Sequence, residues 1–338
     1  MLKRWMHKRE RHHAFLTDNR IVRDFQWGTE FFGGNGENPH EFFSNFSKEI
    51  LQNSDKFFSL PNNIEFTTQN SGLGTLDLEW QSAVKTNCDK NDTVVAKFFP
   101  VDNKRTAIVV LPHWNAPKES YFGLCQLLNK FGMNALRLTL PYHETRMSLE
   151  LVRADYLVAP NVGQTLQSVQ QAVLDTKAAV RWLKNEGYER VGIAGTSIGS
   201  CVAFLAFTHD NDIEAGVFNH VSGYFADVVW QGLSTYHVRE SIEKVVSLED
   251  LREFWRPISP MGYIEKLKEN PRPQKYIYTL YDLSFPVDLS RETIKKIKEI
   301  SPQAESSWLP CGHYTLGETP WKYIDGWKIT SFLKKNLK

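Results

Sequence analysis

The chain has 338 residues, of which 41% are hydrophobic and 23% charged, with a formal net charge of +1. These values are typical of a globular protein with one large core, and they exclude a strongly basic surface for nucleic acid. No apolar run is long enough to cross a bilayer. The four cysteines form no C-x-x-C pair, which argues against a disulfide scaffold or a zinc site. We therefore expect a reducing, cytoplasmic location, no nucleic-acid partner, no metal and no cofactor.

The first 63 residues differ in composition from the rest of the chain. Residues 1–13 are basic, and no apolar stretch follows them, so we do not expect a secretory signal. This stretch suits either a solvated helix or an amphipathic segment that touches anionic lipid. Residues 14–63 are rich in phenylalanine and are interrupted by a glycine-containing loop at 33–36. We expect residues 1–63 to form an N-terminal extension packed on a main domain at 64–338.

The periodicity of the main domain alternates between strands and helices. We predict an antiparallel start to a sheet, a central strand at residues 107–111, a helix at 120–132, a strand at 133–140 and a long helix at 165–186. The antiparallel start comprises residues 64–68, 76–82 and 94–99. Strands that alternate with helices in this way indicate an α/β fold.

Residues 190–199, with the sequence RVGIAGTSIG, carry the strongest motif. A buried strand ends in G-x-S-x-G centred on Ser197, and an apolar helix follows at once. Such a turn is so sharp that strand and helix nearly collide, which explains the small residues two positions on either side of the serine. The N-terminus of the following helix favours a developing oxyanion beside the hydroxyl.

Two further motifs follow in the order that a Ser-Asp-His triad requires. A strand-like run at residues 274–281 ends at Asp282, and a second run at 306–310 leads into Cys311-Gly312-His313. Each residue alone is more often a plain loop residue. The three together, in this order, predict that Ser197, Asp282 and His313 form a nucleophilic triad.

These motifs resemble the α/β-hydrolase superfamily over residues 64–338, most of all its dienelactone-hydrolase and prolyl-oligopeptidase-like branches. The resemblance implies a mostly parallel twisted sheet with helices on both faces, and a helical cap at about residues 222–272. It also implies an oxyanion hole made by the backbone N–H groups of Trp114 and Ile198. The usual His-Gly pair of the first oxyanion loop is replaced here by Pro112-His113.

The aromatic content of residues 222–272 predicts a largely apolar pocket. Residues at strand ends on the same sheet edge are candidates for lining it: His113, His143, Arg146 and His220. A salt-bridged loop is the alternative for His143 and Arg146. The three histidines are also a candidate metal site, but no carboxylate or cysteine completes a recognisable ligand spacing.

We therefore expect a serine hydrolase that cleaves a carboxylic ester, or a related acyl bond, of a small or medium, largely apolar substrate. A peptidase or thioesterase with the same triad is one alternative. A hydrolase-like binding protein without catalysis is the other, because a fold alone does not determine function.

Overall fold

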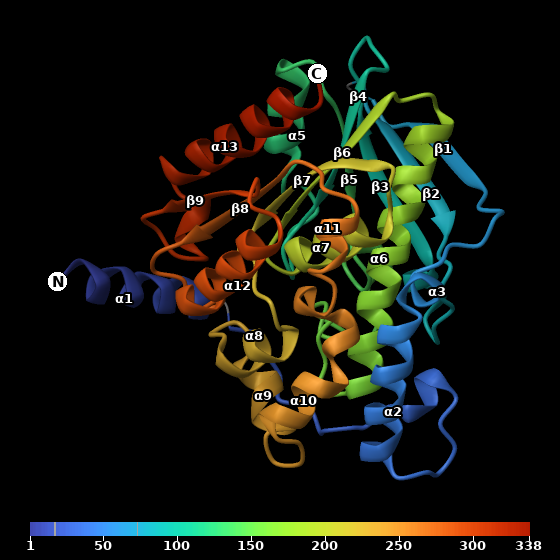
Figure 1. Ribbon diagram of the computed structural model, residues 1–338, viewed down its shortest axis with the longest axis vertical. Helices are drawn as coiled ribbons and strands as arrows, with labels where there is room; N and C mark the ends of the chain where they lie inside the picture. Colours follow the sequence, from blue (N-terminus) through green and yellow to red (C-terminus); the bar gives the residue numbers. More distant parts are fainter. Residues whose placement is uncertain (17, 73) are drawn as a thin grey trace.

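The computed structural model describes residues 1–16, 18–72 and 74–338. Its centre is a nine-stranded sheet in the order β1-β2-β3-β5-β4-β6-β7-β8-β9 (Figure 1). The strands are β1 Phe66–Asn70, β2 Leu76–Gln81, β3 Thr93–Phe99, β4 Thr106–Leu111, β5 Asn134–Leu138, β6 Arg190–Thr196, β7 Ile213–Asn219, β8 Gln274–Thr279 and β9 Glu305–Leu309.

The sheet is mixed, with an antiparallel beginning and a parallel remainder. The β1–β2, β2–β3 and β3–β5 pairs are antiparallel, and every later pair from β5–β4 to β8–β9 is parallel. Parallel strands place their carboxyl ends at one edge, so the residues that follow β4, β6, β7, β8 and β9 gather there. The predicted antiparallel start and the predicted strand-helix alternation are both confirmed.

Helices cover both faces of the sheet. Successive side chains of β4 point to opposite faces and pack against different helices. Val109 and Leu111 belong to one apolar cluster with α6 (Val162–Asn185), α7 (Ile198–His209) and α12 (Val287–Ile300). Ile108 and Val110 belong to a second cluster with α5 (Phe122–Lys130) and α13 (Trp321–Asn336). All six residues of β4 are buried, so the strand is apolar from Ala107 to Leu111 instead of alternating with polar residues.

A helical insertion lies between β7 and β8. Its helices are α8 Phe225–Gln231, α9 Tyr236–Ile242, α10 Leu248–Phe254 and α11 Lys266–Glu269, with short 3₁₀ turns at Arg256–Ile258 and Pro260–Gly262. Figure 1 shows α8, α9 and α10 beyond one end of the sheet. The insertion falls within residues 222–272, and its role as a cap stays a prediction.

The N-terminal segment contributes α1 (Leu2–Phe15), a 3₁₀ turn at Thr29–Phe32, α2 (Pro39–Gln52) and α3 (Ser54–Phe57). Phe43 and Phe58 are fully buried in the same apolar cluster as α6 and α7. In Figure 1, α2 lies against the lower end of α6, whereas α1 extends away from the body on the opposite side. The remaining short elements are α4 (Asp89–Asp92) and 3₁₀ turns at Glu144–Arg146 and Thr315–Gly317.

Within the residues that the structure describes, no helix combines the length and the apolar character needed to span a bilayer.

Candidate active site

Ser197 occupies a strained turn between β6 and α7. Its backbone has φ 60° and ψ −125°, which an L-residue rarely adopts, and it is the N-cap of α7. The turn is held from two sides, because Ser197 N–H donates to Asn219 O at 2.9 Å and Ser200 Oγ donates to Ser197 O at 2.7 Å. The hydroxyl is thus presented at the carboxyl edge of the sheet, as expected of a nucleophile elbow.

The two glycines of the motif are required by close backbone approach. A Cβ at Gly195 would lie 2.0 Å from the carbonyl oxygen of Gly199. A Cβ at Gly199 would lie 2.6 Å from the carbonyl oxygen of Leu111, at the end of β4. Any larger residue would therefore separate α7 from the sheet and move the serine.

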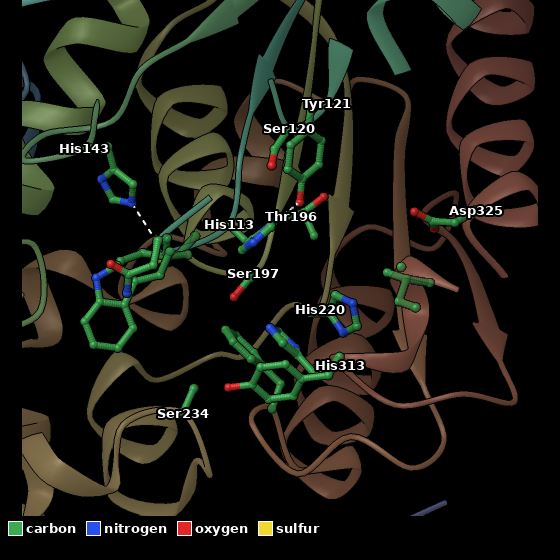
Figure 2. Close-up of a pocket in the computed structure, with 18 of the residues that line it drawn as sticks. His113, Ser120, Tyr121, His143, Thr196, Ser197, His220, Ser234, His313 and Asp325 are labelled. Atoms are coloured by element: carbon green, nitrogen blue, oxygen red, sulfur yellow. Dashed lines mark hydrogen bonds between the residues drawn. The ribbon is translucent and has the colours of Figure 1, made fainter. Parts of the chain in front are cut away.

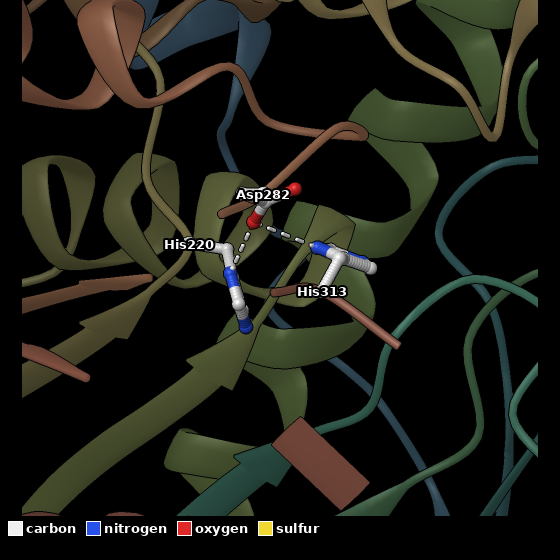
Figure 3. A group of neighbouring side chains, drawn as sticks. All are labelled: His220, Asp282 and His313. Atoms are coloured by element: carbon white, nitrogen blue, oxygen red, sulfur yellow. Dashed lines mark hydrogen bonds and ion pairs between the residues drawn. The ribbon is translucent and has the colours of Figure 1, made fainter. Parts of the chain in front are cut away.

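Asp282 and His313 meet at the same edge, after β8 and β9. His313 Nδ1 lies 3.2 Å from Asp282 Oδ2, and because a carboxylate only accepts, the imidazole nitrogen is the donor (Figure 3). This contact leaves Nε2 of His313 free for a proton from a nucleophile. The second oxygen of Asp282 accepts the N–H groups of Ser284 and Phe285 at 2.8 and 2.7 Å, which fixes the carboxylate.

Ser197 and His313 both line one cavity, and Figure 2 shows the serine hydroxyl turned toward the His313 ring. Among the described residues, the hydroxyl of Ser197 has no hydrogen-bond partner. Contacts of this kind are commonly long in a ligand-free active site and shorten when substrate binds. The structure thus brings the three predicted triad residues to one site.

A second imidazole contacts the same carboxylate. His220 follows β7 with φ 59°, and its Nδ1 donates to Asp282 Oδ2 at 2.7 Å, a shorter contact than that of His313 (Figure 3). The rings of His220 and His313 have centroids 4.4 Å apart. His220 is therefore a neighbour of the candidate triad as well as a pocket residue, and it competes with His313 for one acceptor.

The charges of these groups are strongly coupled. Burial by itself would raise the pKa of Asp282, but the charge on His313 and the hydrogen bonds from both imidazoles hold it far below its usual range. Burial opposes protonation of His313, yet the Asp282 carboxylate raises the pKa of His313 above its usual value. Burial and the charge on His313 lower the pKa of His220. The arrangement therefore favours protonation of His313 over His220.

The loop that follows β4, which was predicted to carry one oxyanion donor, is held by His143. His143 Nδ1 donates to Pro141 O at 2.9 Å, so its Nε2 is an acceptor, and it receives the N–H of Asn115 at 2.8 Å. Burial lowers the pKa of His143 to about 4, which keeps the ring neutral for this role. Trp114 Nε1 also donates to Ala154 O at 2.8 Å. The loop is therefore fixed by hydrogen bonds on both sides.

The backbone N–H groups of Trp114 and Ile198 were predicted as oxyanion donors. Both residues line the cavity beside Ser197, and neither N–H has a hydrogen-bond partner in the part of the chain that the structure describes. Free N–H groups beside a nucleophile are available to an oxyanion. The assignment of these two donors stays a prediction.

The cavity has a volume of about 1170 Å³. His113, His143 and His220 line it, as does Ser197 (Figure 2). The Nδ1 atom of His113 lies 2.9 Å from the hydroxyl of Tyr121, and burial lowers the pKa of His113 to about 3. The three histidines are therefore neutral hydrogen-bonding groups at neutral pH.

Arg146 corrects one sequence-based expectation, because it does not line the cavity. It is fully buried, and its guanidinium donates to Asp175 Oδ2 and to Asn91 O at 2.8 and 2.7 Å. The Glu144–Arg146 turn directs this side chain toward α6 instead of toward Ser197. The salt-bridged loop considered as the alternative is the observed arrangement.

Among the described residues, the Asp282 carboxylate and the imidazoles of His220 and His313 also place three potential metal-ligand atoms within 4.8 Å of one another. Both Nδ1 atoms contact one oxygen, Asp282 Oδ2, at hydrogen-bond distance. Two N–H donors on one acceptor need no cation between them. The predicted metal candidate, in contrast, was the set of His113, His143 and His220.

Two features of the site were missed by sequence reasoning. The contact between His220 and Asp282 depends on β7 and β8 being neighbours in the sheet, which the order of strands in the chain does not reveal. Glu10 is fully buried against the turn that follows His313, although it comes from α1. A basic, polar helix offered no signal for that contact.

No protein-family model matches the chain, and no curated protein matches its sequence. Solved structures do match. An esterase from Pyrococcus furiosus is 18% identical with a TM-score of 0.56, over 81% of this chain and 94% of that one. A cold-adapted esterase from an Arctic intertidal metagenomic library is 16% identical with a TM-score of 0.52, over 83% of this chain and 100% of that one.

An acylaminoacyl peptidase from Pyrococcus horikoshii is 16% identical with a TM-score of 0.59, over 85% of this chain and 43% of that one. At such low identity these matches carry the fold and not the substrate. The mixed, mostly parallel sheet with helices on both faces is consistent with these matches. This chain has the α/β-hydrolase fold.

Proposed function

We propose that the protein is a serine hydrolase that cleaves a carboxylic ester, or a related acyl bond, of a small or medium, largely apolar substrate. One observation carries the proposal. Ser197 stands on a strained elbow that opens into a cavity, and the hydrogen-bonded pair of Asp282 and His313 stands at the same sheet edge. Strain of this kind is retained where it positions a reacting group.

In the proposed reaction, Ser197 Oγ attacks the acyl carbonyl while His313 Nε2 takes the hydroxyl proton. Asp282 holds His313 with its proton on Nδ1 and stabilises the imidazolium that forms. His313 then gives the proton to the leaving alcohol, and an acyl group remains on Ser197. Water repeats the sequence, releases a carboxylic acid and restores the serine.

The negative oxygen of each tetrahedral intermediate is placed at the N–H groups of Trp114 and Ile198. One donor of this kind contributes about 3 to 4 kcal/mol to transition-state stabilisation. The N-terminus of α7 adds its partial positive charge at the same point. His143 supports this arrangement indirectly, since it accepts the N–H of Asn115 and so orients the loop that carries Trp114.

The cavity wall supports an apolar acyl group. Phe225, Val228 and Val229 of α8 line it, together with the half-buried Trp114. The names of two matching structures refer to ester cleavage and that of the third to peptide cleavage, so acyl-transfer chemistry is common to them. We place esters first for this chain because two of these three names refer to ester cleavage and because apolar side chains of α8 line the cavity beside Ser197. The proposed cytoplasmic location agrees with the four free cysteines.

The test is covalent labelling by a fluorophosphonate probe, which reacts with activated serines. We expect mass spectrometry to find the adduct on Ser197 and to find none in the Ser197→Ala variant. Ser234 lines the same cavity (Figure 2), so Ser234→Ala is a matched control that is expected to label like the wild type. A panel of p-nitrophenyl esters, thioesters and amides then ranks the acyl bonds by kcat/KM.

The outcomes separate the proposals. An adduct on Ser197 together with ester cleavage supports the esterase proposal. If amides or thioesters are cleaved faster than esters, the protein is a peptidase or a thioesterase that uses the same triad. Absence of an adduct on folded wild-type protein would contradict the enzyme proposal and favour a hydrolase-like binding protein.

A further inference from the structure

Glu10 is a buried carboxylate that the proposed reaction does not use. It lies on α1 and has no exposed surface, although α1 carries many exposed residues. Its two oxygens accept three hydrogen bonds, from Tyr314 N at 3.0 Å, Thr315 N at 2.9 Å and Thr315 Oγ1 at 2.8 Å. These donors are the two residues that directly follow His313. A segment more than 300 residues distant in the chain therefore shapes the histidine turn.

The same carboxyl group also packs against the residue before His313. A Cβ at Gly312 would lie 2.2 Å from Cδ of Glu10, so Gly312 is the residue that allows the close approach. Gly312 N–H donates to Thr315 Oγ1 at 2.8 Å, and that hydroxyl donates to Glu10. Residues on both sides of His313, Gly312 before it and Tyr314 and Thr315 after it, are thus packed against or bonded to Glu10.

Burial of the charged Glu10 carboxylate lowers the stability of the folded protein. Burial raises the pKa of Glu10, although the hydrogen bonds from Tyr314 and Thr315 act in the opposite direction. No ion pair to Glu10 is found among residues 1–16, 18–72 and 74–338. A buried carboxyl group without a cation usually destabilises a protein, so its retention needs a compensating role.

Several charged or titratable groups face His313. They come from four elements: Asp282 after β8, His220 after β7, His113 after β4 and Glu10 from α1. Asp282 is the dominant partner, and the charge of Glu10 raises the pKa of His313 in the same direction. Glu10 therefore acts on His313 through both the shape of the turn and its charge.

We propose that Glu10 is a positioning residue for His313: α1 supplies a buried carboxylate that fixes the Gly312–Thr315 turn and so holds the imidazole between Asp282 and Ser197. This inference rests on the proposed function. By this inference the N-terminal helix contributes to the geometry of the active site and is not merely packed on the surface.

A second set of side-chain contacts docks α1 at Glu318, whose backbone N–H donates to Thr315 O at 3.1 Å but whose carboxylate, among the described residues, bonds only to α1. Glu318 accepts two hydrogen bonds from Arg9 Nη2, at 2.5 and 2.6 Å, and lies 2.9 Å from His13 Nε2. These side chains are about one third exposed, so the pair contributes little to stability. Glu318→Gln is therefore the matched control, because it weakens the docking of the same helix and leaves Glu10 intact.

The experiment compares three variants with the wild type. Glu10→Gln keeps an amide oxygen for Thr315 but presents an N–H₂ group to Tyr314 N–H and removes the charge. Glu10→Ala removes both acceptor oxygens and with them all three hydrogen bonds. Gly312→Ala leaves Glu10 in place but puts a Cβ where the carboxyl group packs, and so pushes that group away. Each is measured for kcat, KM and the pH profile of ester cleavage, for the rate of fluorophosphonate labelling, and for thermal unfolding.

We expect kcat and labelling rate to fall in all three variants with KM little changed, because a displacement of about 1 Å costs up to about a hundredfold in rate. The Gln variant should retain more activity than the Ala variant. Its acid limb should move to lower pH, because the lost charge no longer favours protonated His313. Glu318→Gln should match the wild type in rate and in pH profile.

Different results would overturn the role of Glu10 and the proposed function. Wild-type rates and an unmoved acid limb in Glu10→Gln would overturn the role of Glu10 while the proposed function stands. A fall in rate that only follows a fall in unfolding temperature, with an unmoved acid limb, would overturn it as well. If Glu10→Ala does not fold, the folded Gln variant decides. Failure of the wild type to label would overturn the proposed function and the role of Glu10 with it.

Discussion

Asp325 offers a test of the electrostatics around the cavity that needs no substrate. It lies in the second turn of α13, is nearly fully buried and lines the cavity to one side of Ser197 (Figure 2). Asn219 Nδ2 donates to its Oδ2 at 2.8 Å, while its Oδ1 has no partner among the described residues. Burial raises the pKa of Asp325 to about 7, against the opposing effect of that hydrogen bond.

The sign of the pH dependence follows from proton linkage. The pKa of Asp325 is near 3.8 in the unfolded chain and about 7 in the folded protein. Below pH 4 both states are protonated, and the group has no effect on stability. Between pH 4 and 7 the unfolded state loses its proton first, so the free energy of unfolding decreases as pH rises. Above pH 7 the penalty is complete.

The magnitude follows from the same two values. A difference of about 3 units at about 1.4 kcal/mol per unit gives a ceiling of about 4 kcal/mol. Cavity water and the polarisable surroundings reduce that ceiling, and we expect about 1 to 3 kcal/mol. Asp325→Asn has nearly the same shape, keeps an acceptor for Asn219 and carries no charge at any pH. It should therefore be more stable than the wild type at pH 8.

The assay is urea unfolding of both proteins at pH 5, 6, 7 and 8. The difference in unfolding free energy between Asp325→Asn and the wild type should grow with pH and then level off above pH 7. Parallel pH dependences would show that Asp325 is ionised in the folded protein. A variant less stable than the wild type at pH 8 would refute the reasoning outright.

Three further predictions concern the site. Activity should fall as pH drops through the raised pKa of His313, because His313 must be neutral to take the serine proton. Asp282→Asn should lower kcat by about 10³- to 10⁴-fold, because the amide has no charge to stabilise the imidazolium and can present its N–H₂ group to His313. An unchanged kcat in this variant would contradict the role of Asp282. His220→Ala should move the acid limb of the activity profile to higher pH, because Asp282 then accepts from His313 without a competing imidazole. His220→Asn retains an N–H donor and tolerates a positive φ, so it should move the acid limb less. Equal pH profiles for the two variants would argue against a carboxylate shared by both imidazoles. Arg146→Met should lower the unfolding free energy by about 3 to 5 kcal/mol, since Asp175 is left buried without its cation. The folded variant should cleave esters near the wild-type rate. Loss of activity without loss of stability would indicate that Arg146 contacts the substrate after all.

Local sequence determined the elements that carry the candidate triad. The apolar run before Ser197 and the two flanking glycines specify a strand, a sharp turn and a helix, because only small residues permit backbone atoms to approach so closely. The strands before Asp282 and His313 are recognisable from their own residues. Since parallel strands share a carboxyl edge, the meeting of these three residues was predictable without coordinates.

Sheet order decided what local sequence left open. His220 and His313 both follow strands, but the placement of β8 between β7 and β9 gives Asp282 to both imidazoles. Arg146 was predicted at the cavity from its position after β5, yet the Glu144–Arg146 turn carries it to Asp175 instead. Side-chain direction within a loop depends on such turns and not on strand order.

The N-terminal helix shows the clearest limit of sequence reasoning. Residues 1–13 read as a basic, solvated segment, and on composition that description holds for most of α1. The one buried carboxylate among them, Glu10, is recognisable only when α1 lies against the turn after His313. The sequence by itself determined the strand-turn-helix elements and the order of the triad, because these depend on neighbouring residues. The tertiary structure alone decided the partners of His220, Arg146 and Glu10, because those contacts join segments that are distant in the chain.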